Sequence, residues 1–258
     1  MDNLEKFAMS TDIFVTAHRG ASGNAPENTL PAFRKAVEAG ARMAEVDVQI
    51  TSDGRVVAFH DDTLDRTTNA KGPVAERNYD ELRSLDAGSW FDKEFAGTKI
   101  PSLEEVIDVI KDKLYLNIEV KSYPGGNVTR DLARIVGTVE GAGYAEYTLY
   151  SSFDHKLLSA IKTIDPALPT AAIMIPGDER LPSEISRETG SEGFVCSIAQ
   201  ISERIAEDAE KHGIFTAVYP VDTPVQLDLT LRFGVKSIVT NFPGEIIEEM
   251  LRIGRMVR

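Results

Sequence analysis

The stretch that decides the fold is MAEVDVQIT at residues 43–51, followed by SDG at 52–54 and RVVAF at 55–59. In the first run, Val46, Val48 and Ile50 alternate with polar residues, and this period of two predicts a strand with two different faces. The pair Asp53-Gly54 is typical of a tight hairpin turn. We therefore expect residues 56–59 to return as a second strand beside the first.

Outward from this hairpin, short apolar runs alternate with helical patterns. Upstream lie a strand at 13–17 and a helix at 29–40, with Thr29 as its expected cap and Gly40 at its end. Downstream, strands are predicted at 114–120, 148–152, 170–175, 194–198, 214–221 and 237–240. Helices are predicted at 101–113, 128–142, 154–164, 202–212, 223–233 and 245–253, and none is assigned between residues 175 and 194.

About eight main strands, most followed by a helix, indicate a parallel sheet covered by helices. At 258 residues this pattern favours a closed α/β barrel of the TIM-type (β/α)8 class over an open doubly wound sheet. The absence of a glycine-rich dinucleotide motif after the first strand weakens the open-sheet alternative. Residues 62–100 break the rhythm and are interpreted as a small insertion with short helices after the second barrel strand. We expect one domain over residues 1–258.

Charge and composition limit the function classes. The chain has 28 Lys+Arg against 41 Asp+Glu, a net charge of −13, with 42% hydrophobic residues. That apolar content is ordinary for a globular protein and argues against disorder. The acidic excess argues against nucleic acid or an anionic membrane as partner. An anionic substrate would also be repelled unless a local patch reverses the sign.

The sequence also gives an expectation about the cellular compartment of the protein. Cys196 is the one cysteine, so no intramolecular disulfide can form, and its apolar neighbours predict a buried structural thiol. The first residues do not resemble a signal peptide, and no apolar run is long enough for a membrane span or stable membrane insertion. We expect a cytoplasmic protein; the sequence leaves open whether it forms a homo-oligomer.

Acidic side chains occur where barrel enzymes place their chemistry, at the C-terminal ends of strands. Alternation sets Glu45 and Asp47 on one face, and Glu119 shares a face with Lys121 on a later strand. Buried carboxylates need a cation or a metal nearby. Three carboxylates from two strands suit a hard divalent cation, Mg²⁺ or Ca²⁺, better than zinc. The alternative is a structural ion-pair network with Arg19 and Lys121.

Two histidines, His18 and His60, also lie at predicted strand ends. Beside a carboxylate cluster they form a plausible general acid and base pair. Arg19 and Lys121, together with a metal, would make a locally positive pocket for a phosphate group. Glu27 and Asn28 precede a helix, and the sequence leaves open whether they are solvated neighbours of its cap or part of the site.

An ordered series of motifs resembles the glycerophosphodiester phosphodiesterase family. The series is HRG at 18–20, PENT at 26–29, EVDV at 45–48, TSDG at 51–54, HD at 60–61, LDRTT at 64–68, IPSLEE at 100–105 and NIEVK at 117–121. The second half of the chain is similar more loosely. The resemblance implies a TIM-type barrel with a small insertion. It implies metal ligands Glu45, Asp47 and Glu119, acid–base residues His18 and His60, and phosphate contacts from Arg19 and Lys121.

The family cleaves glycerophosphodiesters to glycerol 3-phosphate and an alcohol, and three positions here depart from its usual pattern. Tyr219 and Asp222 lie where members often carry a tryptophan and an asparagine, and Asn241 lies where an aspartate is common. Tyr219 is still expected to form a wall of the pocket. These departures put the identity of the alcohol in question.

The sequence is compatible with two other functions besides hydrolysis of glycerophosphodiesters. One is a lysophospholipase-D-like phosphodiesterase that acts on lipid-like diesters, which an exposed apolar lip would favour. The other is a non-catalytic barrel that binds phosphodiesters, supported by the departures at Tyr219, Asp222 and Asn241. The head group, the preferred metal and the separate roles of the two histidines are left open by the sequence.

Overall fold

The computed structural model describes residues 1–8, 13–121 and 126–255. The predicted single domain over 1–258 includes three short segments that lie outside the described residues, and its extent stays a prediction. No helix among the described residues is long and apolar enough to cross a membrane.

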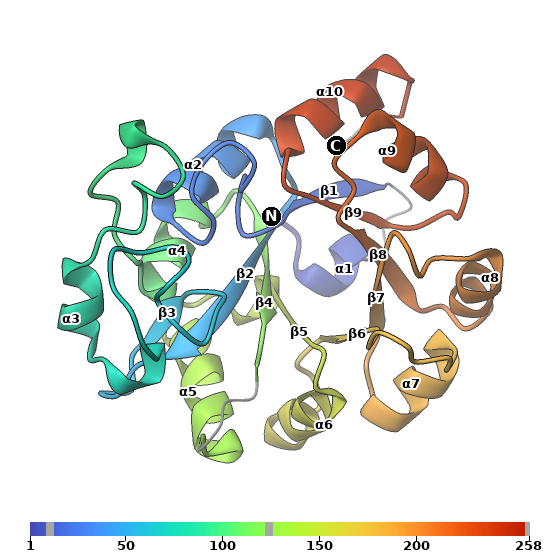
Figure 1. Ribbon diagram of the computed structural model, residues 1–258. Helices are drawn as coiled ribbons and strands as arrows, with labels where there is room; N and C mark the ends of the chain where they lie inside the picture. The colour runs from blue at the N-terminus through green and yellow to red at the C-terminus, as the bar shows by residue number, and fades with distance from the viewer. Residues whose placement is uncertain (9–12, 122–125, 256–258) are drawn as a thin grey trace.

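The strands close into a parallel barrel (Figure 1). The barrel is closed because β1 pairs in parallel with β2 on one side and with β9, the last strand in the sequence, on the other. β3 pairs antiparallel with β2 and stands outside the ring, as the Asp53-Gly54 turn predicts. The TIM-type prediction is confirmed. The barrel strands are β1 (Phe14–Ala17), β2 (Met43–Ile50), β4 (Tyr115–Glu119), β5 (Thr148–Ser152), β6 (Thr170–Ile173), β7 (Gly193–Ser197), β8 (Phe215–Tyr219) and β9 (Ser237–Thr240), and the extra strand is β3 (Val56–Ala58).

Helices surround the barrel in Figure 1. Each helix predicted outside the insertion is present, with ends shifted by a few residues. Two helices were not expected from the sequence, α1 and α7. The helices are α1 (Leu4–Ala8), α2 (Leu30–Ala39), α3 (Tyr79–Ser84), α4 (Leu103–Ile110), α5 (Val128–Gly141), α6 (His155–Ile164), α7 (Pro182–Thr189), α8 (Glu203–Lys211), α9 (Pro224–Leu231) and α10 (Pro243–Arg252).

Every residue of β2 is buried, because the strand has helices on one face and the barrel interior on the other. Val46 and Val48 belong to the main hydrophobic cluster with residues of α4 and α5. The alternate positions, Glu45 and Asp47, therefore point to the barrel interior. A smaller apolar cluster, which includes Ala171 and Val239, comes from β6 to β9.

The insertion forms its own small core against β3. Val57 of β3 packs with Leu64, Val74 and Leu82 in one buried cluster. The short helices expected there are present as α3 and two 3₁₀ turns. The insertion is thus fastened to the hairpin that extends β2, and this brings its first residues close to the strand ends.

The N-terminal end of the barrel is covered by α1. Phe7 stacks on Tyr115 of β4 with ring centroids 4.0 Å apart, and Phe14 and Met43 belong to the same cluster. These contacts explain a helix of five residues, which is too short to be stable alone. On β7, Cys196 is fully buried, and burial raises the pKa of its thiol to about 12, as expected for a structural cysteine.

Candidate active site

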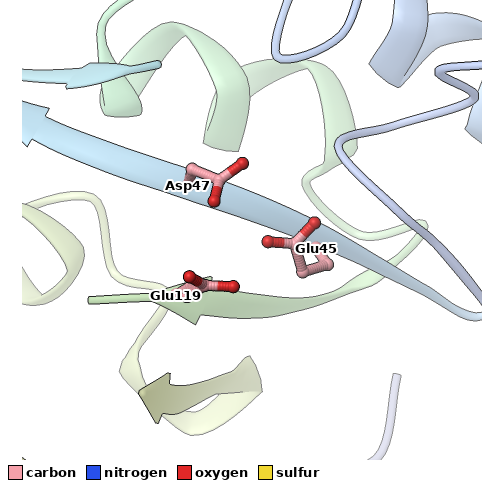
Figure 2. Close-up of side chains that lie close together, drawn as sticks. All are labelled: Glu45, Asp47 and Glu119. Carbon is pink, nitrogen blue, oxygen red and sulfur yellow. The ribbon is translucent and has the colours of Figure 1, made fainter. Parts of the chain in front are cut away.

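Glu45 and Asp47, within β2, converge with Glu119 at the end of β4 (Figure 2). The register pairs Asp47 with Glu119 directly across the two strands. One oxygen from each of the three residues lies within 4.8 Å of the others. Glu45 and Asp47 are buried, and Glu119 is half-buried. The sequence prediction that alternation brings these carboxylates together is confirmed as geometry.

The electrostatics of this cluster favour an added cation. Burial, reinforced by the charge of Asp47, raises the pKa of Glu45 to about 8 and that of Glu119 to about 8. Burial also opposes the ionisation of Asp47, but the charges of Lys121 and Arg19 outweigh it and hold that pKa below its usual range. Two protein cations thus stabilise one carboxylate and leave the other two costly to ionise.

The two carboxylate oxygens of Glu45 have different surroundings. Glu45 Oε2 accepts a hydrogen bond from the backbone N–H of Arg19 at 2.7 Å, whereas Glu45 Oε1 is buried with no partner among the described residues. An orphaned carboxylate oxygen beside two further carboxylates is the donor set that Mg²⁺ or Ca²⁺ binds. The residues present therefore fit a hard divalent ion.

Arg19 and Lys121 both contact Asp47. Arg19 Nε lies 3.2 Å from Asp47 Oδ2, and Lys121 Nζ lies 2.8 Å from Asp47 Oδ1. Lys121 is also 3.7 Å from Glu119. The ion-pair network considered above is therefore present, and it contains Asp47 and Glu119, two of the three carboxylates of the candidate metal site. The two interpretations are compatible, since the cations neutralise only part of the negative charge.

Both histidines lie beside the carboxylate cluster. His18 Nε2 is 4.0 Å from Glu45 Oε2, and His60 Nε2 is 4.0 Å from Asp47 Oδ1. Burial lowers the pKa of each imidazole below its ordinary value, although Asp47 opposes the shift in both. Both rings are therefore favoured in the neutral form near neutral pH, and each directs one nitrogen toward the same space.

A second set of charged residues supports the cluster from outside. Arg66, at the start of the insertion, donates to Asp61 with Nε at 2.7 Å, and donates to Glu27 with Nη2 at 2.7 Å. Asp61 in turn lies 2.5 Å from His60 Nδ1, and Glu27 accepts from Arg19 at 2.9 Å. We call Glu27, Asp61 and Arg66 the Arg66 clamp. It connects the predicted phosphate-binding arginine to a predicted catalytic histidine.

Sequence reasoning did not assign Arg66 or Asp61 to the site. It left Glu27 and Asn28 open, and the structure places both in it: Asn28 Nδ2 donates to Asp47 Oδ2 at 2.8 Å. Thr29 occupies the predicted cap position of α2, but its hydroxyl donates to the carbonyl of Pro26 rather than capping the helix. The sequence did contain one indication that these residues belong to the site, because all of them lie within the motifs quoted above.

The backbone around the site is constrained. Gly20 has φ +76°, and a Cβ there would lie 2.7 Å from the backbone carbon of Ala32 in α2. Arg19 and Asn28 also adopt positive φ, 54° and 56°, which is uncommon for residues with side chains. These conformations direct the Arg19 N–H to Glu45 and the Asn28 amide to Asp47. The turn after β1 is therefore shaped around the carboxylates.

Tyr219 ends β8 and faces the barrel interior with Phe153. The two rings meet edge to face, with centroids 6.4 Å apart, and burial, reinforced by the charge of Glu119, raises the pKa of the Tyr219 hydroxyl to about 12. This position is consistent with the predicted aromatic wall. The structure thus brings together all eight residues that the sequence singled out for the site.

Comparisons with known proteins agree with this picture. The sequence profile of the glycerophosphoryl diester phosphodiesterase family matches residues 18–245. A glycerophosphodiester phosphodiesterase from Caldanaerobacter subterraneus subsp. tengcongensis is 35% identical over 238 residues, which cover 90% of this chain and 96% of that protein.

Solved structures are also similar. The crystal structure of a glycerophosphodiester phosphodiesterase from Agrobacterium tumefaciens superposes with a TM-score of 0.78 at 30% identity, covering 90% of this chain and 97% of that one. The structure of an Oleispira antarctica phosphodiesterase in complex with the product sn-glycerol-3-phosphate gives a TM-score of 0.86 at 28% identity, covering 94% and 98%.

The fold is a TIM-type barrel, and the family profile, which spans most of the chain, places it among the phosphodiesterases. The protein belongs to the glycerophosphoryl diester phosphodiesterase family. It is therefore a phosphoric diester hydrolase.

Proposed function

We propose that this protein hydrolyses glycerophosphodiesters to glycerol 3-phosphate and an alcohol, with a divalent cation held by Glu45, Asp47 and Glu119. The observation that carries the proposal is the convergence of three carboxylate oxygens within 4.8 Å, one neighbouring oxygen being buried without a partner. Mg²⁺ and Ca²⁺ both suit these ligands. The family relatives named above support the substrate class.

The two histidines are proposed as the acid–base pair. One of them, as the neutral imidazole, takes the proton from the attacking hydroxyl. The other first takes up a proton from solvent and, as the imidazolium, gives a proton to the departing alcohol oxygen, so that protons balance over the step. In the scheme we favour, the attacker is the neighbouring glycerol hydroxyl, whose proximity promotes a cyclic phosphate that water then opens. His18 Nε2 lies 4.0 Å from Glu45, and His60 Nε2 lies 4.0 Å from Asp47. The two rings thus reach different carboxylates of the cluster, which suits two separate proton transfers.

Charge compensation is the part assigned to the cations. When bound, the ion supplies Lewis-acid stabilisation of the negative phosphate oxygens. Arg19 and Lys121 are proposed to contact the same oxygens, since both already reach into the cluster through Asp47. The site is then locally positive within a protein whose net charge is −13, which removes the conflict with an anionic substrate.

Release of glycerol 3-phosphate from glycerophosphocholine tests this proposal. We expect turnover that stops when EDTA removes the metal and returns with Mg²⁺ or Ca²⁺. Activity confined to lysolipids would instead support the lysophospholipase-D-like alternative. No turnover on a panel of diesters, with metal supplied, would support a non-catalytic barrel.

Two substitutions test the histidines. We expect His18→Ala and His60→Ala each to lower kcat by about 10²-fold or more. His212→Ala is the matched control, because His212 lies at the end of α8, where its ring contacts the carbonyl of Asp208. Near wild-type turnover in either of the first two variants would remove that histidine from the mechanism.

A further inference from the structure

The residues that depart from the family pattern after β8 and β9 form a hydrogen-bonded chain behind His18. Asn241 Oδ1 lies 2.8 Å from His18 Nδ1 and also accepts a hydrogen bond from Ser22 Oγ at 2.8 Å. At the other end of the same amide, Asn241 Nδ2 donates to Asp222 Oδ2 at 2.7 Å. The chain therefore runs from a carboxylate through an amide to the imidazole, on the side away from Glu45.

Asp222 determines which way the amide of Asn241 points. Its other oxygen, Oδ1, already accepts from Thr240 Oγ1 at 2.9 Å and from the backbone N–H of Asn241 at 2.8 Å. A carboxylate only accepts hydrogen bonds, so the group that faces its remaining oxygen must be the NH₂ of Asn241. The amide oxygen is then turned toward His18. Since that oxygen also only accepts, His18 must donate from Nδ1.

We propose that Asp222 and Asn241 are positioning residues that hold neutral His18 in the tautomer protonated on Nδ1. Nε2 is then the nitrogen with a free lone pair, and it is the nitrogen that faces the carboxylate cluster, 4.0 Å from Glu45 Oε2. The inference rests on the proposed function, in which His18 transfers a proton. It adds the two residues that decide which nitrogen is available for that transfer.

The departures in sequence agree with this role. The family commonly has an amide where this chain has Asp222, and a carboxylate where it has Asn241. In this chain the acceptor opposite His18 Nδ1 is Asn241 Oδ1, and Asp222 is the partner behind it. The two patterns differ in where the negative charge lies. In this chain the charged group is Asp222, which contacts Asn241 and not the imidazole of His18. The two positions should therefore be exchangeable together but not singly.

A single substitution, Asp222→Asn, reverses the chain. The new amide keeps its oxygen toward Thr240 and turns its NH₂ toward Asn241, whose own amide must then present its oxygen to it and its NH₂ to His18. The imidazole becomes an acceptor at Nδ1 and carries its proton on Nε2. We expect kcat to fall by about 10²-fold, the usual size of an acid–base contribution, with a much smaller change in KM.

The double exchange, Asp222→Asn with Asn241→Asp, restores the original direction of the hydrogen bond between residue 241 and His18. The carboxylate at 241 again accepts from His18, and the new amide donates to that carboxylate. We expect most of the lost kcat to return. Asp208→Asn is the matched control: its carboxylate, like that of Asp222, accepts hydrogen bonds through both oxygens, from Ser183 at 2.8 and 3.0 Å, but it lies on α8. We expect this control to retain wild-type turnover.

Nitrogen-15 NMR of the histidine ring reads the tautomer without turnover, and the His18→Ala variant assigns the signal. We expect an Nδ1-protonated ring in the wild type and the double exchange, and an Nε2-protonated ring in Asp222→Asn. A wild-type ring protonated on Nε2 would overturn the proposal, and so would a double exchange as slow as the single variant. Because this readout needs no substrate, its failure is distinguishable from failure of the proposed function.

Discussion

Metal binding should release protons from this site, and the number can be worked out from the structure. Glu45 and Glu119 have pKa values raised to about 8 by burial and by Asp47. At pH 7 such a group is protonated in about nine molecules of ten. A divalent cation binds the ionised carboxylates. We therefore expect the metal-free protein to release close to two protons for each ion bound at pH 7, and far fewer at about pH 9.

The affinity for the ion should follow the same count. Where both groups are protonated before binding, each unit of pH below 8 is expected to raise the dissociation constant by up to about 10²-fold, a factor of about ten for each proton. Titration calorimetry with Mg²⁺ or Ca²⁺, repeated in buffers of different ionisation enthalpy, measures both the proton count and the affinity.

Two variants make this test specific. Glu119→Gln has the shape of the protonated acid but no proton to lose, so it should release about one proton fewer and bind the ion more weakly. Glu248→Gln, at an exposed position on α10, is the matched control and should leave the count unchanged. A count near zero at pH 7 in the wild type would show that both carboxylates are already ionised, and the argument from burial would be refuted.

Three further predictions concern stability. The raised pKa values of Glu45 and Glu119 favour the folded state while these groups are protonated. The melting temperature of the metal-free protein should therefore fall as pH rises from about 5 to about 8, and it should recover when metal is added. A melting temperature that does not change with pH would contradict the pKa shifts. Gly20→Ala should destabilise the protein by about 2 kcal/mol or more in a denaturant titration, because the new Cβ would meet the backbone of Ala32. Gly40 has a similar left-handed backbone conformation but open space around it. Gly40→Ala should therefore cost about 1 kcal/mol in the same titration. Phe7→Ala should cost about 3 kcal/mol by removing the ring stacked on Tyr115; a loss below about 1 kcal/mol would show that α1 is not needed to close the barrel.

The barrel strands could be predicted from the sequence because they are short, mostly apolar runs, and several of them carry polar residues within or directly after the run. β2 shows both signals in one stretch: Val46 and Val48 for the shell, Glu45 and Asp47 for the interior. The helices with a clear apolar stripe were predicted for the same reason. α7 was missed because Ile185 is the only large aliphatic residue in its sequence, PSEISRET, and α1 because it depends on packing against residues distant in the chain.

The carboxylates and histidines of the site could be predicted from their positions at strand ends, whereas the Arg66 clamp could not. Arg66 lies in a polar segment with no periodic pattern, and nothing in the sequence indicates that it reaches both Asp61 and Glu27. Asn28 was ambiguous because residues of its type commonly precede helices. Contacts of this kind depend on how loops meet in space, and local sequence does not encode that.

The Arg66 clamp has a consequence for engineering and for the evolution of this barrel. The insertion at 62–100 has its own core, so it resembles a module that could be exchanged for the corresponding segment of a relative. Yet its first turn carries the guanidinium that joins Glu27 and Asp61. A chimera that kept the module's core but lost this one side chain would leave the carboxylates of Glu27 and Asp61 close together without the cation that they share. A transplanted unit that begins at residue 62 must therefore keep an arginine at position 66.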